Sequence, residues 1–509
     1  MDHLLGVDAG TSSTKAVLVG TDGTVAAEAS LSHSVDLPAP GRAEQDPDGV
    51  WWKELAQLCC TLAERAPRAW RTLRGVGVSA IGATVVPVAA DGRVVHPAIL
   101  YGIDTRAERE IDLLNRRLGP RRILRVSGRS LSAQAVGPKI LWLRRHCKAV
   151  FEQTAHFLSA PGFLTFRLTG VPIMDHYSAV SFAPLYDVAG RTWHQDALTE
   201  VVPRDRLPRL AWSADIAGQV TAEASVLTGL PPGTPVVVGT SDAAAEALSV
   251  GVTEPGDVML MYGSTLFIVA VVRRWRPDRT FWPTIFCLPG VSTVTAGTAT
   301  FGAAERWLVE EILAAPGERE GLIHDAMTYP PGSDGLVMLP YLSGERSPLH
   351  DPHASGAVVG LTLRHTRAHL YRALLEGTAF SVRHNLELLE EKWGRARRLV
   401  AVGGGSDNVL WRRIVSDVLD RPQVMCRQRI GAAYGAAYLA GLGCGLVDGL
   451  NTLRERWAVE VARETPDPTA HSAYEVPYQV YRRLYRQLKR DMHVVSRLQH
   501  RGEPPTPRP

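Results

Sequence analysis

The short polar stretch from Asp8 to Lys15 combines a carboxylate, a glycine, four hydroxyl side chains and a lysine. Gly10 lets the backbone approach a ligand closely, and the hydroxyl and amide groups of Thr11 and Ser12 point into one small volume. Asp8 is suited to hold a divalent cation through an oxygen or a water, and Lys15 is suited to meet phosphate charge. An ordinary hairpin with a polar tip explains this stretch equally well.

A second copy of this design lies half a chain further on, where Gly263 is followed by Ser264 and Thr265. Both copies are flanked by apolar runs, which predict a strand, a tight turn and a second strand in each case. One such turn arises easily by chance, but two at half-chain spacing indicate an internal duplication. Two domains that each present such a turn could grip a polyphosphate from both sides.

Asp242 stands where a buried strand, Val236–Gly239, gives way to an alanine-rich segment that is predicted to be a helix. At such a junction a carboxylate can face a cleft while its backbone stays fixed. The ordinary alternative is a helix N-cap, which an isolated aspartate in this setting favours. Asp242 becomes a candidate for catalysis only in combination with its surroundings.

A third glycine loop, Gly403-Gly404-Gly405, follows the apolar run from 399 to 402 and precedes a predicted helix near 409–419. Bare backbone at a helix N-terminus can accept an α-phosphate or a ribose. The loop is neither GxxxxGK[ST] nor GxGxxG, and a plain glycine-rich turn is the alternative.

Asp104 and Arg106 come just past an apolar strand, a position that suits hydrogen bonding to a polyhydroxylated ligand. A local salt bridge that opens the helix at Ala107 explains the same pair nearly as well. His365 and His369 have a spacing that could serve a metal, but no HExxH surrounds them and no third ligand is evident. A packing or surface role is therefore favoured for these histidines.

Composition limits the remaining possibilities. A chain of 509 residues is too long for one core and is expected to form two large domains. A net charge of +4 without a basic face gives no support for nucleic-acid binding, and six cysteines without CxxC spacing predict reduced thiols. The apolar runs are too short to span a bilayer, and an N-terminus that enters a strand directly predicts no signal peptide. A cytoplasmic protein without membrane or nucleic-acid partners is expected.

Several elements must position these side chains. We expect a third strand from Thr24 to Leu31 after the opening hairpin, and a helix that starts at Asp46. Beyond Pro477 an apolar stripe predicts an amphipathic helix packed on the body, and the tail Glu503–Pro507 is expected to be disordered. The stripe consists of Tyr481, Leu484, Tyr485, Leu488 and Met492.

Taken together, these motifs resemble the FGGY family of carbohydrate kinases, and the xylulokinase-like members in particular. The resemblance extends from Leu4 to Gly445 and rests on seven ordered motifs. They are DAGTSSTK at Asp8, YGIDTRA at Tyr101, GTSDAAAEALSVG at Gly239, YGST at Tyr262, LPYLSGERSP at Leu339, GLTLRHTRAHLYRALLEG at Gly360 and GGGSDNVLWRRIVSDVL at Gly403.

The resemblance implies an α/β fold of two actin-like (ribonuclease H-like) ATPase domains with a cleft between them. We predict an N-terminal domain over residues 1–248 that binds sugar and phosphate, and a C-terminal domain over 249–450 that binds ATP. A linker, a C-terminal helix and the tail then occupy 451–509. The substrates implied are MgATP and a small sugar or polyol, and a homodimer is compatible with this organisation.

The resemblance also implies a role for each candidate residue. Asp242 would accept the proton of the attacking sugar hydroxyl, and Asp8 would position Mg²⁺. Thr84, Asp104 and Arg106 would join Asp242 in binding the sugar. The residues implied in ATP binding are Gly10, Thr11, Ser12, Lys15, Gly263, Ser264, Thr265, Gly403, Gly404, Gly405 and Asn408.

The loop from Ser79 to Thr84 departs from the xylulokinase pattern, which usually carries a Met-His pair there. This loop helps to choose the sugar, so ribulose, erythritol and gluconate stay open beside a ketopentose such as xylulose. A non-catalytic actin-like ATPase is the alternative from another class, although such a protein has no need of a sugar-facing carboxylate. A sugar kinase clan with a cysteine-rich zinc motif is disfavoured because no cysteine cluster is present.

Overall fold

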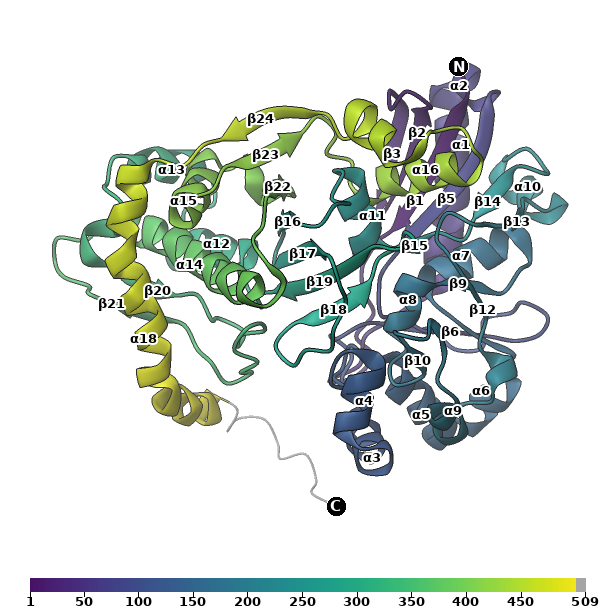
Figure 1. Cartoon of the computed structure of the whole chain (residues 1–509), viewed down its shortest axis with the longest axis horizontal. Coiled ribbons are helices and arrows are strands. Elements are labelled where there is room, and N and C mark those ends of the chain that lie inside the picture. The colour runs from purple at the N-terminus through teal and green to yellow at the C-terminus, as the bar shows by residue number, and fades with distance from the viewer. Residues whose placement is uncertain (500–509) are drawn as a thin grey trace. The chain divides into compact units, whose positions relative to one another are not determined.

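The computed structural model describes residues 1–499, so the predicted disordered tail lies outside the described residues. The chain divides into two compact units (Figure 1). Unit 1 comprises Met1–Glu254, Val271–Val294 and Ile430–Val459. Unit 2 comprises Pro255–Ala270, Thr295–Arg429 and, within the described residues, Glu460–Gln499. The predicted boundary at residue 248 falls close to the first crossing between the units.

The central sheet of unit 1 contains the predicted opening hairpin and third strand. Its order is β13-β14-β5-β1-β2-β3, with β15 paired to β5 beside this path. β1, β2 and β3 form an antiparallel meander, whereas β5 runs parallel to β1. β1 and β5 therefore end at the same edge of the sheet. The strands are β1 (His3–Ala9), β2 (Ser13–Gly20), β3 (Val25–Ser32), β5 (Leu73–Ala80), β13 (Ile216–Gln219), β14 (Pro235–Val237) and β15 (Thr240–Ser241).

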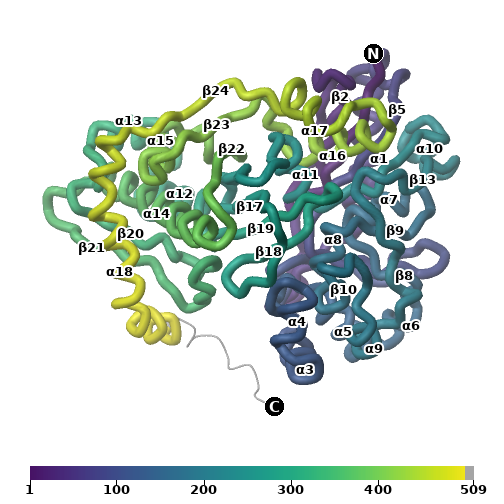
Figure 2. The backbone as a smooth tube through the Cα atoms, viewed as in Figure 1, coloured from purple at the N-terminus to yellow at the C-terminus, as the bar shows by residue number. Residues whose placement is uncertain are grey.

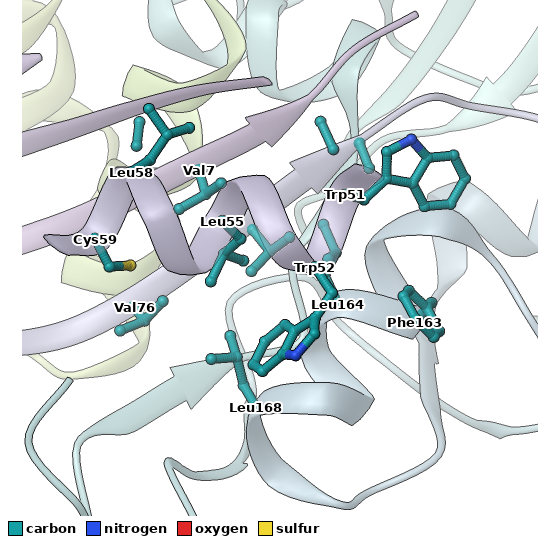
Figure 3. Packing of buried hydrophobic residues seen from close by; sticks show 14 of the residues in the cluster. Val7, Trp51, Trp52, Leu55, Leu58, Cys59, Val76, Phe163, Leu164 and Leu168 are labelled. Carbon is teal, nitrogen blue, oxygen red and sulfur yellow. The ribbon is translucent and has the colours of Figure 1, made fainter. Parts of the chain in front are cut away.

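Helix α1 (Lys53–Arg65) packs its apolar side on this sheet. The Asp46 carboxylate caps the chain at the predicted start, and a wide π-type turn over Pro47–Trp52 precedes the helix. Trp51 is fully buried, and its ring meets Phe163 edge-on at 6.4 Å (Figure 3). Aromatic, leucine, valine and alanine side chains together form this core, with the tryptophans among its largest members.

Helix α16 (Ala432–Gly443) belongs to unit 1, although the sequence predicts it within the second domain. It lies so close to the sheet that a Cβ on Gly6 would stand 1.9 Å from the Ala433 carbonyl oxygen. A Cβ on Gly77 would stand 1.9 Å from the carbonyl oxygen of Ala436. Glycine at both positions is therefore required for this contact.

Unit 2 repeats the topology of unit 1. Its sheet runs in the order β19-β17-β16-β22-β23-β24, with β16 antiparallel to β17 and parallel to β22. β23 is parallel to β22 and antiparallel to β24, as β14 is to β5 and β13. The structure thus confirms the second hairpin and the duplication predicted from the two glycine turns. The strands are β16 (Asp257–Tyr262), β17 (Leu266–Val272), β19 (Ser292–Gly297), β22 (Arg398–Val402), β23 (Gln423–Cys426) and β24 (Glu460–Glu464).

The C-terminal helix α18 (Pro468–Gln499) runs along unit 2 beside β20 (Val337–Leu339), as the yellow tube in Figure 2 shows. It starts nine residues before Pro477, because that proline is accommodated inside the helix. Tyr481, Tyr485 and Met492 are buried, which confirms the predicted packing face. Among residues 1–499, no helix is both long and apolar enough to cross a membrane.

The remaining elements complete the two units. In unit 1 they are β4 (Glu44–Gln45), β6 (Val86–Val88), β7 (Ala98–Ile99), β8 (His156–Leu158), β9 (Ile173–Asp175), β10 (Tyr186–Asp187), β11 (Thr192–Trp193), β12 (Arg209–Ala211), β18 (Trp282–Ile285), α2 (Pro67–Trp70), α3 (Glu108–Leu118), α4 (Pro120–Ser127), α5 (Val136–His146), α6 (Lys148–Gln153), α7 (Ala160–Thr169), α8 (His176–Val180), α9 (Gln195–Val201), α10 (Ala222–Thr228), α11 (Asp242–Ser249) and α17 (Gly449–Thr452). In unit 2 they are β21 (Ala357–Val359), α12 (Gly302–Trp307), α13 (Arg319–Met327), α14 (Arg367–Trp393) and α15 (Val409–Leu419).

Candidate active site

Asp8 lies at the carboxyl end of β1, beside the neighbouring end of β5. The Ser79 hydroxyl of β5 donates a 2.7 Å hydrogen bond to the Asp8 carboxylate, and Lys15 stands opposite Asp8 in the antiparallel ladder. Burial raises the pKa of Asp8, while the Ser79 bond and the Lys15 charge oppose that rise. Lys15 and Ser12 are exposed, so both can meet a ligand.

The turn between β1 and β2 is fixed by side chains from outside it. A ring nitrogen of His33 lies 3.1 Å from the Gly10 carbonyl oxygen, and its other nitrogen lies 2.8 Å from Glu54. The Gln45 amide donates to the Thr11 carbonyl oxygen at 2.9 Å. The sequence did not predict these contacts, because His33, Gln45 and Glu54 come from three separate parts of the chain.

Asp242 is the first residue of α11, and Ser241 occupies the N-cap position instead. The Asp242 carboxylate accepts a 2.8 Å hydrogen bond from the Ala243 N–H and another from the Gly82 N–H. Burial, followed by the nearby charge of Asp8, raises the pKa of Asp242 to about 7. A carboxylate with such a pKa is suited to general-base chemistry near neutral pH.

Glu246 joins this group and was missed from the sequence. It stands one helical turn after Asp242, and burial together with the charge of Asp8 raises its pKa to about 7, against the opposing charge of Lys15. A Cβ on Gly431 would lie 2.3 Å from a Glu246 carboxylate oxygen. The i, i+4 spacing on an alanine-rich helix was the available signal, since such residues share one face.

The loop after β5 carries Thr84 two residues after Gly82, whose N–H bonds to the Asp242 carboxylate. Thr84 is 1% exposed, and its hydroxyl donates to the Gly82 carbonyl oxygen at 3.2 Å. Ala83 adopts a left-handed backbone with φ of +53°. Backbone strain at a non-glycine residue persists where the surrounding structure holds it, often at functional sites. The sugar-binding role of Thr84 stays a prediction.

Asp104 and Arg106 form the salt bridge that the sequence offered as the alternative to ligand binding. Asp104 is fully buried; it accepts the Ala43 N–H at 2.8 Å and pairs with Arg106 Nη2 at 2.6 Å. Arg106 also pairs with Glu44 at 2.7 Å. The carboxylate is therefore held by protein groups, and contact between this pair and a sugar stays a prediction.

Lys139 holds the loop that carries this pair. Its ammonium donates to the carbonyl oxygens of Leu100 and Tyr101, the latter at 2.9 Å. Burial lowers the pKa of Lys139 to about 7. The two carbonyl bonds fix the backbone just before Asp104, and sequence reasoning missed this role of Lys139.

The second glycine turn lies in unit 2 and carries the start of α12. The Phe301 N–H donates to the Ser264 carbonyl oxygen at 2.9 Å, and the Gly302 N–H donates to that of Gly263 at 3.0 Å. Ser264 is exposed and Thr265 is half-buried. This turn and the Gly10 turn occupy equivalent places after the first strand of each repeated sheet.

The third glycine loop follows β22. A Cβ on Gly403 would lie 2.8 Å from the Tyr262 carbonyl oxygen, whereas a Cβ on Gly404 would meet nothing within 4 Å. Asn408 caps α15 by accepting the Trp411 N–H at 3.1 Å, and its amide donates to Tyr371 Oη at 3.0 Å. Backbone packing thus explains Gly403, and open space remains at Gly404.

The two histidines of the spaced pair serve the fold. The His365 ring accepts the Thr362 N–H at 2.9 Å, and the His369 ring accepts the Thr366 N–H at 3.0 Å in a capping box. Within residues 1–499, no group of three or more acidic, histidine or cysteine side chains has the arrangement to hold a metal ion by itself. Both rings thus take part in local hydrogen bonds of the fold.

Relatives of known activity cover nearly the whole chain. The chain is 28% identical to the xylulose kinase of Bacillus subtilis (strain 168) over 488 residues, 95% of this chain and 96% of that protein. It is 25% identical to the gluconokinase of the same strain over 465 residues, 89% and 90% of the two chains. The crystal structure of xylulose kinase from Rhodospirillum rubrum superposes with a TM-score of 0.90 at 33% identity, covering 96% of this chain and all of that one.

Two family models account for the two halves. The N-terminal domain of the FGGY family of carbohydrate kinases matches residues 3–249, and the C-terminal domain of that family matches residues 258–444. These ranges include Asp8 and Asp242 in the first match and both unit 2 glycine turns in the second. The predicted fold, of two related α/β domains, is confirmed together with the phosphotransferase class. The chain belongs to the FGGY family of carbohydrate kinases.

Proposed function

We propose that this enzyme transfers the γ-phosphoryl group of MgATP to a hydroxyl of a ketopentose such as xylulose. The xylulose kinases of Bacillus subtilis and Rhodospirillum rubrum support this acceptor, whereas the gluconokinase similarity supports an aldonate. Ribulose and erythritol are further candidates. The observation that carries the proposal is the environment of Asp242, which holds a base of suitable pKa at the start of α11.

Asp242 would act as the general base. Its carboxylate takes the proton of the acceptor hydroxyl while the hydroxyl oxygen bonds to the γ-phosphorus and the bond to the β–γ bridging oxygen breaks, which leaves ADP. The N–H groups of Ala243 and Gly82 hold the carboxylate in place during this transfer. A positioned base contributes about 10² to 10⁴ in rate.

The carboxylates of unit 1 suit a divalent cation. The charge of Asp8 raises the pKa of Asp242 and of Glu246, and the charge of Asp242 adds to the rise at Glu246. This excess negative charge, opposed by Lys15, fits Mg²⁺ with oxygen and water ligands. Asp8 would hold the ion, directly or through water. When bound, Mg²⁺ supplies charge neutralisation for the phosphoryl oxygens.

ATP would contact both glycine turns and the third glycine loop. In unit 1 the backbone of Gly10, Thr11 and Ser12, together with Lys15, would meet phosphate oxygens. In unit 2 Gly263, Ser264 and Thr265 would do the same. Gly403, Gly404, Gly405 and Asn408 would lie near adenosine, and the open space at Gly404 supports this placement.

The acceptor would lie beside Asp242. Thr84 offers the lone pairs of its hydroxyl, and Asp104 with Arg106 would act as a paired unit that shapes the pocket wall. A cytoplasmic location and a homodimer complete the proposal, with no nucleic-acid or membrane partner.

ADP release with and without a panel of ketoses, alditols and aldonates tests this function. We expect turnover that depends on the acceptor and on Asp242. Acceptor-independent turnover that survives Asp242→Ala would show an ATPase and reject the kinase mechanism.

A further inference from the structure

Arg129 follows helix α4 in unit 1 and is a half-buried guanidinium without a carboxylate partner among residues 1–499. Its one hydrogen bond runs from Nη2 to the Val180 carbonyl oxygen at 2.9 Å. None of its other nitrogens is a fully buried atom that lacks a hydrogen-bond partner. Arg106, by contrast, is bound by both Asp104 and Glu44. Arg129 therefore keeps most of its donors available in a partly desolvated place.

The backbone around Arg129 is fixed. Gly128 ends α4 in a left-handed conformation with φ of +76°, and its carbonyl oxygen accepts the Asp278 N–H at 3.1 Å. A Cβ on Gly128 would lie 2.8 Å from the Trp275 ring and 3.2 Å from the Pro283 carbonyl oxygen. The arginine thus projects from an ordered corner of unit 1, where its position is defined before any ligand binds.

Helix α8 connects this corner to Asp242. Val180 at the end of α8 accepts the Arg129 bond, and Ser178 of the same helix lies 2.9 Å, between hydroxyl oxygens, from Ser241. Ser241 directly precedes Asp242. Two residues apart on a helix, the Cα atoms of Ser178 and Val180 are separated by about 5 Å, from the helix radius and rise. Arg129 is therefore within a few side-chain lengths of the proposed base.

Tyr177 lies on α8 next to Ser178. Its ring packs edge-on against Phe286 at 6.3 Å, and its hydroxyl makes no hydrogen bond within residues 1–499. Burial and then the charge of Asp242 raise the pKa of Tyr177, while the Arg129 charge opposes this rise. The phenol is thus close enough to sense the proposed base and the guanidinium together, and it stays a neutral donor.

Desolvation makes Arg129 a strong attractor of negative oxygen. Burial lowers its pKa to about 10, and the Tyr177 phenol is the group whose charge opposes that shift. A guanidinium presents five N–H donors in a planar fork. This fork suits carboxylate and carbonyl oxygens, which only accept, better than it suits hydroxyl groups, which also donate. A charge desolvated without a partner gains more from such an acceptor than one in water.

We propose that Arg129, assisted by Tyr177, is a specificity-determining residue that binds an sp² oxygen of the acceptor. This inference rests on the proposed kinase function. The oxygen belongs either to the ketone of a ketose or to the carboxylate of an aldonate, and both groups accept hydrogen bonds from a guanidinium. An alditol lacks that oxygen and leaves the guanidinium unpaired, so alditols are poor substrates.

Three five-carbon acceptors that differ at one end test the proposal: xylulose with a ketone, xylonate with a carboxylate, and xylitol with neither. We expect wild-type kcat/KM for xylulose or xylonate to exceed that for xylitol by at least tenfold. Arg129→Met should lower kcat/KM for the preferred acceptor about 10- to 100-fold, mainly through KM, and alter that for xylitol less than about threefold. Whichever of the first two acceptors shows this loss identifies the oxygen.

Matched variants separate recognition from folding. Arg125→Met, at an exposed position on α4, should leave all three acceptors and the KM for ATP unchanged. Arg129→Lys keeps a charge and should retain part of the selectivity, and it replaces the methionine variant if that protein does not fold.

Equal losses of kcat/KM on all three acceptors would overturn the inference, because they would indicate a structural role. Wild-type enzyme that uses xylitol as well as xylulose would overturn it as well, while leaving the kinase function intact. Wild-type enzyme that phosphorylates no sugar, alditol or aldonate would reject the proposed function, and the inference with it.

Discussion

Replacing Asp242 by asparagine should abolish most activity and at the same time stabilise the metal-free protein. The pKa of Asp242 rises from 3.8 to about 7 because burial and the charge of Asp8 disfavour the ionised form. A rise of about 3 units corresponds to at most about 4 kcal/mol. Since Asp242 is half-buried and solvent screens part of this cost, we expect about 1–3 kcal/mol. Asparagine keeps an oxygen for the Ala243 N–H and carries no charge.

The sign of this effect depends on pH. The folded-state pKa of Asp242 lies above its unfolded value, so the folded protein binds more protons between about pH 4 and pH 7. The contribution of Asp242 to wild-type stability is therefore most favourable below about pH 4 and is lost as the pH rises through about 7. The advantage of Asp242→Asn should be absent near pH 4 and largest near pH 8.

Thermal melting in EDTA without nucleotide measures the stability term, and coupled ADP release measures activity. At pH 8 we expect a higher melting temperature for Asp242→Asn, by about 2–8 °C, and a kcat lower by about 10² to 10⁴. In wild-type enzyme kcat/KM should fall as the pH drops below about 7. Asp112→Asn, at an exposed position on α3, should change neither property. An Asp242→Asn variant that keeps wild-type turnover, or melts earlier than wild type at pH 8, would refute the reasoning.

Three further substitutions test the neighbouring groups. Asp8→Asn should raise the Mg²⁺ concentration needed for half-maximal turnover and depress kcat, and full activity at ordinary Mg²⁺ would contradict its metal role. Glu246→Gln removes a carboxylate whose pKa is raised to about 7 by burial and by the charges of Asp8 and Asp242, so it should raise the melting temperature in EDTA at pH 8; a lower melting temperature would count against this shift. Gly435→Ala places a Cβ 1.9 Å from the Ala245 carbonyl oxygen and should lower the free energy of urea unfolding by about 1–3 kcal/mol. Gly321→Ala in α13, with open space around it, should be neutral or stabilising. Equal effects of the two substitutions would contradict the packing argument.

Local pattern was sufficient for the elements whose signal is periodic. The hairpin around Gly10, its repeat around Gly263 and the helix that starts at Asp46 are all present as predicted. The stripe that includes Tyr481 is buried as predicted. In each case the spacing of apolar residues and the turn chemistry point to the same structure.

Long-range pairing was beyond the sequence pattern. The helix Ala432–Gly443 packs on β1 through Gly6, a contact across more than 400 residues, and nothing in the local pattern assigns it to unit 1. The ion pairs of Arg106 with Asp104 and with Glu44, the latter from a separate strand, were likewise beyond the local pattern.

The sequence by itself determined the residue types of the site and the strand ends and turns that carry them, because turn chemistry and hydrophobic period act over a few residues. Only the tertiary structure determined the pKa values of these residues and which charged groups lie beside them. The charge of Asp8 raises the pKa of Asp242 and Glu246 because the fold brings the end of β1 close to α11, and Arg129 lacks a carboxylate because none of the described elements brings one to it. Burial and the distances between charged groups depend on the whole fold, so no short stretch of the chain determines them.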